Sequence, residues 1–141
     1  MSTDDNKDLV RRFQDGMLEA LRTGNPDPLL DTVDPDCVFG MSGMPSTLEG
    51  MRQMLPAFRT AFSDMQVTVG EMIAEGDRVA YCLTATCTHT GEFMGIPATG
   101  KRVTFTETHL DQIANGKIVR HDGDWDQLGM LQQLGVLPAM G

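Results

Sequence analysis

The spacing of apolar residues changes from a mainly helical to a mainly strand-like period close to Asp64, and this change restricts the fold more than any other feature. Before Asp64, apolar residues recur with the helical period of about 3.6 residues. After it, apolar and polar residues alternate with a period of two, which is typical of half-buried strands. Helices followed by a meander of antiparallel strands predict the α+β class.

End signals place the individual elements. An amphipathic helix is expected over 3–23, where a Gly-Asn-Pro sequence at 24–26 stops it. Ser46 or Thr47 can cap a further helix, which Pro56 should kink or split. The remaining expected elements are short helices at 28–33 and 128–134, and strands at 37–41, 67–73, 79–89, 103–113 and 117–122.

Composition argues against several classes of protein. The chain has 141 residues, so 1–141 are expected to form a single domain. Its net charge of -9 argues against nucleic acid and against an anionic membrane surface, because both need clustered Lys and Arg. The apolar runs are too short to span a bilayer, and the acidic N-terminus lacks a signal-peptide pattern. Three cysteines without a CxxC pair predict reduced thiols in a cytoplasmic protein.

Three segments resemble one protein family when taken as a set. They are HTGEFMGIPATGKRVTF at 89–105, THLDQIANGKIVRH at 108–121 and DWDQLGMLQQLG at 124–135. Over nearly its whole length the chain is similar to the SnoaL-like polyketide cyclases, or ester cyclases, of the nuclear-transport-factor-2-like superfamily. The resemblance implies a curved antiparallel sheet and N-terminal helices that form a cone-shaped α+β barrel, in a homo-oligomer (dimer or tetramer). It also implies intramolecular aldol ring closure of a polyketide without metal or cofactor.

The register of the hairpin around Asn115-Gly116 decides which side chains face His109. With a two-residue turn, His109 lies opposite Asp122, on the same face of the sheet. With a three-residue loop that includes a bulge, His109 lies opposite His121, and both Asp122 and Asp124 point to the other face. The resemblance favours the second register, in which the two histidines are neighbours.

An aldol reaction needs a base that takes a proton next to a carbonyl and an acid that protonates the new alkoxide. A carboxyl group in an apolar pocket beside an imidazole can do both. The resemblance places the family's catalytic aspartate at Gly123, so the role is expected to pass to Asp124, which a bulge at Gly123 would turn inward. Asp122 is the reserve acid. His109 is expected to bind or polarise the carbonyl, with His121 as its neighbour.

Other side chains are expected to contact the substrate, which should be a small polyketide-like or other hydrophobic carbonyl compound. These expected substrate-binding residues are Glu107, Trp125, Met41, Phe39, Met54 and Phe58. Glu107 shares the face of His109 by strand parity and can orient it. No metal site is expected, because His121 and Asp122 are adjacent and diverge on a strand.

Two further functions remain open, because one fold can support many chemistries. The first is epoxide hydrolysis, or a hydration or dehydration step, in which a carboxylate activates water. The second is non-catalytic binding of a hydrophobic ligand, which is favoured by Gly123 in the expected place of the acid.

Overall fold

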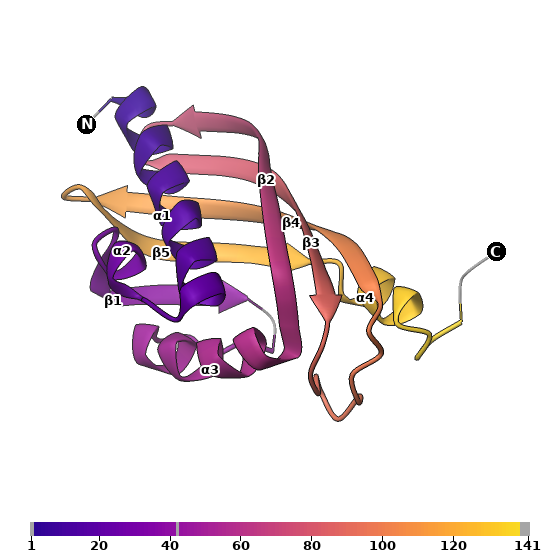
Figure 1. The fold of residues 1–141 in the computed structure, drawn as a ribbon. Helices are drawn as coiled ribbons and strands as arrows, with labels where there is room; N and C mark the ends of the chain where they lie inside the picture. The colour runs from indigo at the N-terminus through magenta and orange to yellow at the C-terminus, as the bar shows by residue number, and fades with distance from the viewer. Residues whose placement is uncertain (1, 42, 139–141) are drawn as a thin grey trace.

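The computed structural model describes residues 2–41 and 43–138. Figure 1 shows the order of the elements along the chain. In this part of the chain they are α1 (Thr3–Thr23), α2 (Asp27–Leu30), β1 (Val33–Met41), α3 (Leu48–Ala61), β2 (Phe62–Glu75), β3 (Arg78–His89), β4 (Arg102–Ala114), β5 (Lys117–Trp125) and α4 (Gln127–Gln133). The expected change from helices to a strand meander is therefore confirmed.

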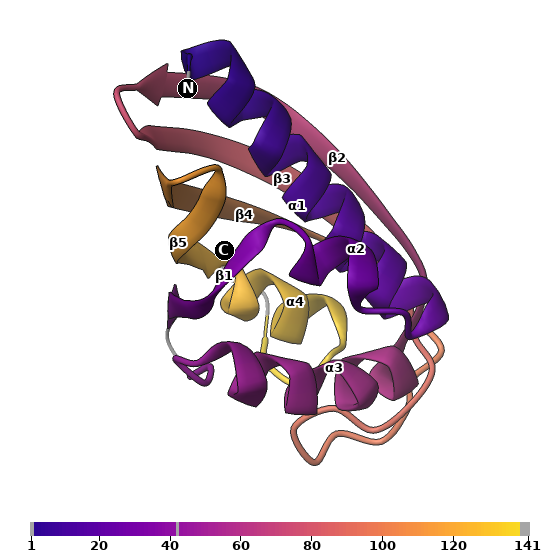
Figure 2. The ribbon, with the colours of Figure 1, turned by 90° about the vertical axis from the view of Figure 1, so that its left-hand side faces the viewer.

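The strands form one curved sheet in the order β1-β5-β4-β3-β2. β2 to β5 make an antiparallel meander, whereas β1 pairs with β5 in parallel. A parallel pair needs a long connection, and here α3 and the whole meander supply it. Figure 2 shows α1, α2 and α3 on one side of this sheet. The α+β class is confirmed, with a mixed sheet in place of a wholly antiparallel one.

α1 has the boundaries that its sequence signals predict. The Ser2 hydroxyl accepts a hydrogen bond from the Asp5 backbone, and the Asp5 carboxylate accepts one from the Ser2 backbone, which forms a capping box. Gly24 ends the helix with φ of 83°, a left-handed conformation that glycine adopts readily. Val10 and Phe13 on its apolar face are fully buried, so this face holds α1 on the sheet.

α3 begins after Thr47, whose hydroxyl accepts a hydrogen bond from the backbone of Gly50. The helix continues through Pro56, so the prediction of a split at this residue is wrong. Pro56 lacks the N–H that would bond to the carbonyl of Arg52. Both residues are exposed, so water can donate to that carbonyl instead.

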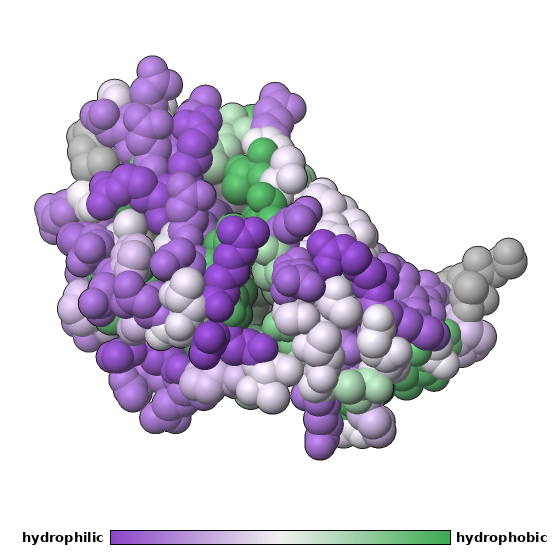
Figure 3. Space-filling model, in the orientation of Figure 1, coloured by the Kyte–Doolittle hydropathy of each residue, from purple (hydrophilic) through white to green (hydrophobic). Residues whose placement is uncertain are grey.

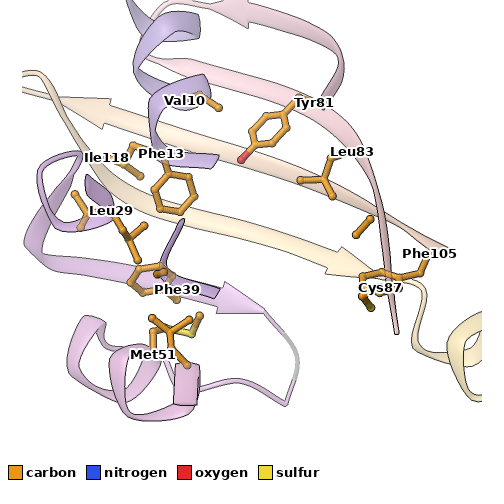
Figure 4. Close-up of a cluster of buried hydrophobic side chains, with 14 of the residues drawn as sticks. Val10, Phe13, Leu29, Phe39, Met51, Tyr81, Leu83, Cys87, Phe105 and Ile118 are labelled. Atoms are coloured by element: carbon orange, nitrogen blue, oxygen red, sulfur yellow. The ribbon is translucent and has the colours of Figure 1, made fainter. Parts of the chain in front are cut away.

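The surface is mainly hydrophilic on the side seen in Figure 3, where hydrophobic residues gather in a hollow near the centre. The core lies behind it, between the helices and the sheet. Figure 4 shows Phe13 of α1, Phe39 of β1 and Tyr81 of β3 directed into this core. Among the described helices, none combines the length and the hydrophobicity needed to cross a bilayer.

Candidate active site

An apolar cavity lies between the helices and the inner face of the sheet. Methionines are prominent in its lining, which includes Met17, Met41, Met44, Met51, Met65 and Met130. A methionine side chain is flexible and polarisable, so it adapts to ligands of irregular shape. The lining therefore suits a hydrophobic molecule and leaves its orientation to a few polar groups.

Four polar side chains interrupt this lining in the described part of the chain. Gln14 comes from α1, Glu107 and His109 from β4, and His121 from β5. The rings of His109 and His121 stack, with centroids 4.5 Å apart and planes inclined by 22°. β4 and β5 are hydrogen-bonded neighbours, so the sheet itself brings the two histidines together.

A buried carboxylate orients His121. Nδ1 of His121 lies 2.5 Å from Oδ1 of Asp111, its direct partner across the two strands. Asp111 is 0% exposed, and its other oxygen accepts a hydrogen bond of 2.8 Å from the Tyr81 hydroxyl. That hydroxyl accepts one of 2.8 Å from Nε2 of Gln14. Since Nδ1 is occupied by Asp111, Nε2 is the nitrogen of His121 that remains for the cavity.

Tyr81 keeps its proton in this network. Burial, together with the negative charge of Asp111, raises the pKa of Tyr81 well above its ordinary value of 10.0. The hydroxyl therefore remains a donor to Asp111. A carboxylate that accepts from two fixed donors cannot rotate away from the imidazole.

The ionisation of Tyr81 can be followed directly, because it is the only tyrosine. The folded chain holds this proton more tightly than the unfolded chain, so the resulting stability is complete below pH 10.0 and is lost as the pH rises through the folded-state pKa. At pH 10.0 we expect no tyrosinate absorbance from the native chain, whereas the urea-unfolded chain is about half ionised. A native titration midpoint near 10.0 would contradict the buried contact with Asp111.

His109 forms a second histidine–carboxylate pair, with Glu107. Nε2 of His109 lies 2.8 Å from Oε1 of Glu107, two residues earlier on the same face of β4. The side chain of His109 is 2% exposed and that of Glu107 is 22% exposed. Glu107 is therefore the carboxylate that reaches the cavity, and His109 fixes its direction.

The position opposite His109 is occupied by Gly123. A Cβ atom there would lie 2.2 Å from Nδ1 of His109 and 2.5 Å from the backbone oxygen of Thr108. Both distances are too short, and the second involves backbone, which cannot turn aside. This packing therefore requires glycine and leaves no room for an aspartate at the position that the family resemblance indicates.

The hairpin adopts neither of the two expected registers. Asn115-Gly116 forms a two-residue turn, with φ values of 51° and 74°. A bulge between Ile118 and Arg120 then shifts the pairing by one residue, so His109 meets Gly123. A one-residue shift exchanges the faces of a strand. His109 and His121 therefore share one face of the sheet, as the three-residue loop predicted. The turn itself has two residues, as the other register predicted.

The prediction that Asp124 points into the cavity is wrong. The bulge lies near the turn and not at Gly123, so the alternation of faces continues undisturbed through Asp124, which is exposed. The reserve acid Asp122 lies on the same outer face, where it accepts a hydrogen bond of 2.7 Å from Nε of Arg120. Neither aspartate lines the cavity.

The expected substrate-binding residues divide into two groups. Those that line the cavity are Glu107, Trp125, Met41 and Phe58. Phe39 is instead buried against His121, with ring centroids 5.9 Å apart, so it supports the imidazole from the core. Met54 is half-buried on α3 and lies outside the lining. The apolar pattern of the sequence predicts that both side chains face the interior. It does not show whether they pack in the core or line the cavity.

Asp111, Tyr81 and Gln14 are not among the residues expected from the sequence. Strand parity was the available signal for Asp111, since Glu107, His109 and Asp111 alternate on one face. No local pattern connects the other two, because Tyr81 lies 30 positions from Asp111 and 67 positions from Gln14. Only the packing of α1 on β3 and the pairing of β3 with β4 bring them together.

The donor groups of the site are suited to proton transfer. Across the described residues, no cluster of three or more His, Cys, Asp and Glu side chains has the geometry of a metal site. The two histidine–carboxylate pairs supply imidazole and carboxylate groups that can exchange protons.

Comparison with known proteins is consistent with this geometry. A family model described as SnoaL-like polyketide cyclase matches residues 9–134. The chain is 34% identical to aklanonic acid methyl ester cyclase of Streptomyces peucetius over 134 residues, which covers 91% of this chain and 89% of that one. It is 32% identical to nogalonic acid methyl ester cyclase of Streptomyces nogalater over 129 residues, covering 84% and 92%. The crystal structure of AclR, a candidate hydroxylase from Streptomyces galilaeus, superposes with a TM-score of 0.85 at 30% identity, covering 99% and 91%.

Proposed function

The chain belongs to the SnoaL-like polyketide cyclase family, and on this basis we propose that it closes a ring of a polyketide-like compound by an intramolecular aldol reaction. The observation that carries the proposal is the His121–Asp111 pair, in which a buried carboxylate directs an imidazole into an apolar cavity. An imidazole held in this way is a suitable general base and acid.

In the proposed reaction, Nε2 of His121 takes a proton from the carbon next to a substrate carbonyl. The resulting enolate attacks a second carbonyl of the same molecule, so one carbon–carbon bond forms and the attacked oxygen becomes an alkoxide. The imidazolium then returns its proton to the alkoxide, and the cycle neither gains nor loses a proton. Asp111 supports both transfers, because its carboxylate on Nδ1 stabilises the positively charged ring.

Glu107 and His109 complete the site as positioning residues. The Glu107 carboxylate reaches the cavity, where it can accept a hydrogen bond from a hydroxyl group of the substrate. His109 holds Glu107 through Nε2 and stacks on His121, so it limits the movement of both.

Incubation with aklanonic acid and with its methyl ester tests the proposal, because a relative is named for the ester. In chelator-treated buffer we expect a cyclic product of unchanged mass, detected by chromatography and NMR. Uptake of labelled oxygen from water would indicate hydration or hydrolysis in place of cyclisation. Binding without conversion would indicate a carrier.

We also propose that the chain associates with a second copy of itself and is located in the cytoplasm. Ile73 and Leu110 are exposed on the outer face of the sheet, where a second copy can cover them. Cys37 and Cys87 are free, and burial raises their pKa values to about 12 and about 11. Their thiols therefore stay protonated, as suits a reducing compartment.

A further inference from the structure

A second hollow adjoins the cavity, and three arginines from different elements line it. Arg22 lies near the end of α1, Arg59 near the end of α3, and Arg102 at the start of β4. These three side chains are called the arginine pocket below. The whole chain has 11 Lys and Arg residues against 20 Asp and Glu residues, so their clustering is a local reversal of its charge.

Backbone carbonyl groups hold the three guanidinium groups. Nε and Nη2 of Arg22 donate to the oxygen of Met65 at 3.0 and 2.7 Å. Nη2 of Arg102 donates to the oxygen of Asp64 at 3.2 Å, and Nη2 of Arg59 donates to that of Arg22 at 3.4 Å. A guanidinium group has five N–H donors, so each arginine is positioned while some of its donors remain free.

An irregularity in β2 makes these carbonyls available. The pairing of β2 with β3 shifts between Ser63 and Gln66, and Asp64 adopts a φ of 51°. Backbone groups at such a bulge leave the regular ladder. The bulge thus presents the carbonyls of Asp64 and Met65 to the arginines.

The positive charge of the arginine pocket is not neutralised by ion pairs within the described residues. The ion pairs found there involve other basic side chains. Asp64 is the one acidic residue in the described lining, and the oxygen that it gives to Arg102 is its backbone oxygen. Positioned but unpaired guanidinium groups are suited to an anionic ligand, and their planar geometry matches a carboxylate.

The arginine pocket adjoins the apolar cavity, because Leu21, Phe62 and Met65 contribute to the lining of both. A ring system in the cavity can therefore place an end group among the arginines. We propose that the arginine pocket binds the carboxylate of an aromatic polyketide acid, so that this chain takes the free acid, whereas two relatives are named for methyl esters. The choice of ring system rests on the proposed function, and the choice of acid over ester rests on the arginines.

Binding can be measured without turnover, because Trp125 is the only tryptophan and lines the cavity. Its fluorescence should be quenched by anthraquinone carboxylate and by the methyl ester of the same compound. At low ionic strength we expect the dissociation constant of the acid to be about tenfold lower than that of the ester. This difference should shrink as salt is added, because partly exposed charges are screened.

Single substitutions locate the effect. Arg22→Gln, Arg59→Gln and Arg102→Gln should each raise the dissociation constant of the acid about threefold, as is usual for exposed charges, and leave that of the ester unchanged. Arg78→Gln is the matched control, because it removes the same charge from an exposed arginine that lines neither hollow.

Equal affinity for acid and ester, absence of binding by both, or an equal effect of Arg78→Gln would overturn the proposal. Failure of the cyclase function gives a different result. Preference for the acid without ring closure would support the arginine pocket and contradict the proposed cyclase function. Faster cyclisation of the methyl ester than of the acid would support the cyclase function and contradict the role of the arginine pocket.

Discussion

Replacement of His121 by glutamine is expected to lower the turnover number for ring closure by about 10²–10⁴-fold, the usual loss when a general acid–base group is removed. Nε2 of His121 is the proposed proton carrier, and Asp111 fixes its direction through Nδ1. The amide of glutamine can still form hydrogen bonds in the cavity, but it cannot carry the proton at neutral pH. The measurement is the turnover number at saturating substrate.

Asp124→Asn is the matched control for this experiment. Asp124 is exposed on the outer face of the sheet, so its loss should leave the turnover number unchanged. A large fall in Asp124→Asn, with full activity in His121→Gln, would restore the assignment made from the sequence and refute the one made from the structure. Circular dichroism and the thermal midpoint of both variants show whether a lost rate reflects chemistry or unfolding.

Asp111→Ala is expected to lower the free energy of unfolding by about 3–5 kcal/mol, the usual loss when one partner of a buried pair is removed. The variant leaves the Tyr81 hydroxyl and Nδ1 of His121 without their acceptor, and it opens space in the core. The total stability of a domain is only about 5–15 kcal/mol, so the change should be evident in urea unfolding.

Two variants test whether this loss comes from the hydrogen bonds of Asp111. Asp111→Asn should lower the free energy of unfolding by less, about 1–3 kcal/mol. Its amide oxygen can still accept a hydrogen bond from Tyr81, but its NH₂ group faces the N–H of His121, and two donors cannot form a hydrogen bond. Asp124→Ala should change stability by no more than about 0.5 kcal/mol, because its side chain is exposed. An Asp111→Ala variant as stable as the wild type would show that the network does not support the fold.

Most of the fold follows from local signals. The Gly-Asn-Pro stop after α1, the cap of α3 and the change of period near Asp64 are enough to locate these two helices and the long strands. The parallel pairing of β1 with β5 does not follow from them, because strand direction within a sheet depends on the path of the chain between the strands. Pro56 does not break α3, and both Pro56 and Arg52, whose carbonyl loses its N–H partner, are exposed residues.

The site could be predicted only in part. Parity places Glu107 and His109 on one face, and the structure confirms that both line the cavity. Parity also places Asp111 on this face, but it does not show that Asp111 is the fully buried carboxylate. Asp124 was favoured because it stands beside Gly123, but the bulge lies near the turn and β5 stays regular through Asp124.

The sequence by itself determined the order of helices and strands, the apolar face of each one and the position of the turn at Asn115-Gly116, because these depend on spacing and on neighbouring residues. Only the tertiary structure decided which carboxylate lies next to His121. A single bulge between Ile118 and Arg120 sets the register, and the distant Tyr81 hydroxyl makes the buried place of Asp111 favourable. Local patterns define the faces of a strand, but burial and hydrogen bonding are properties of the assembled layers.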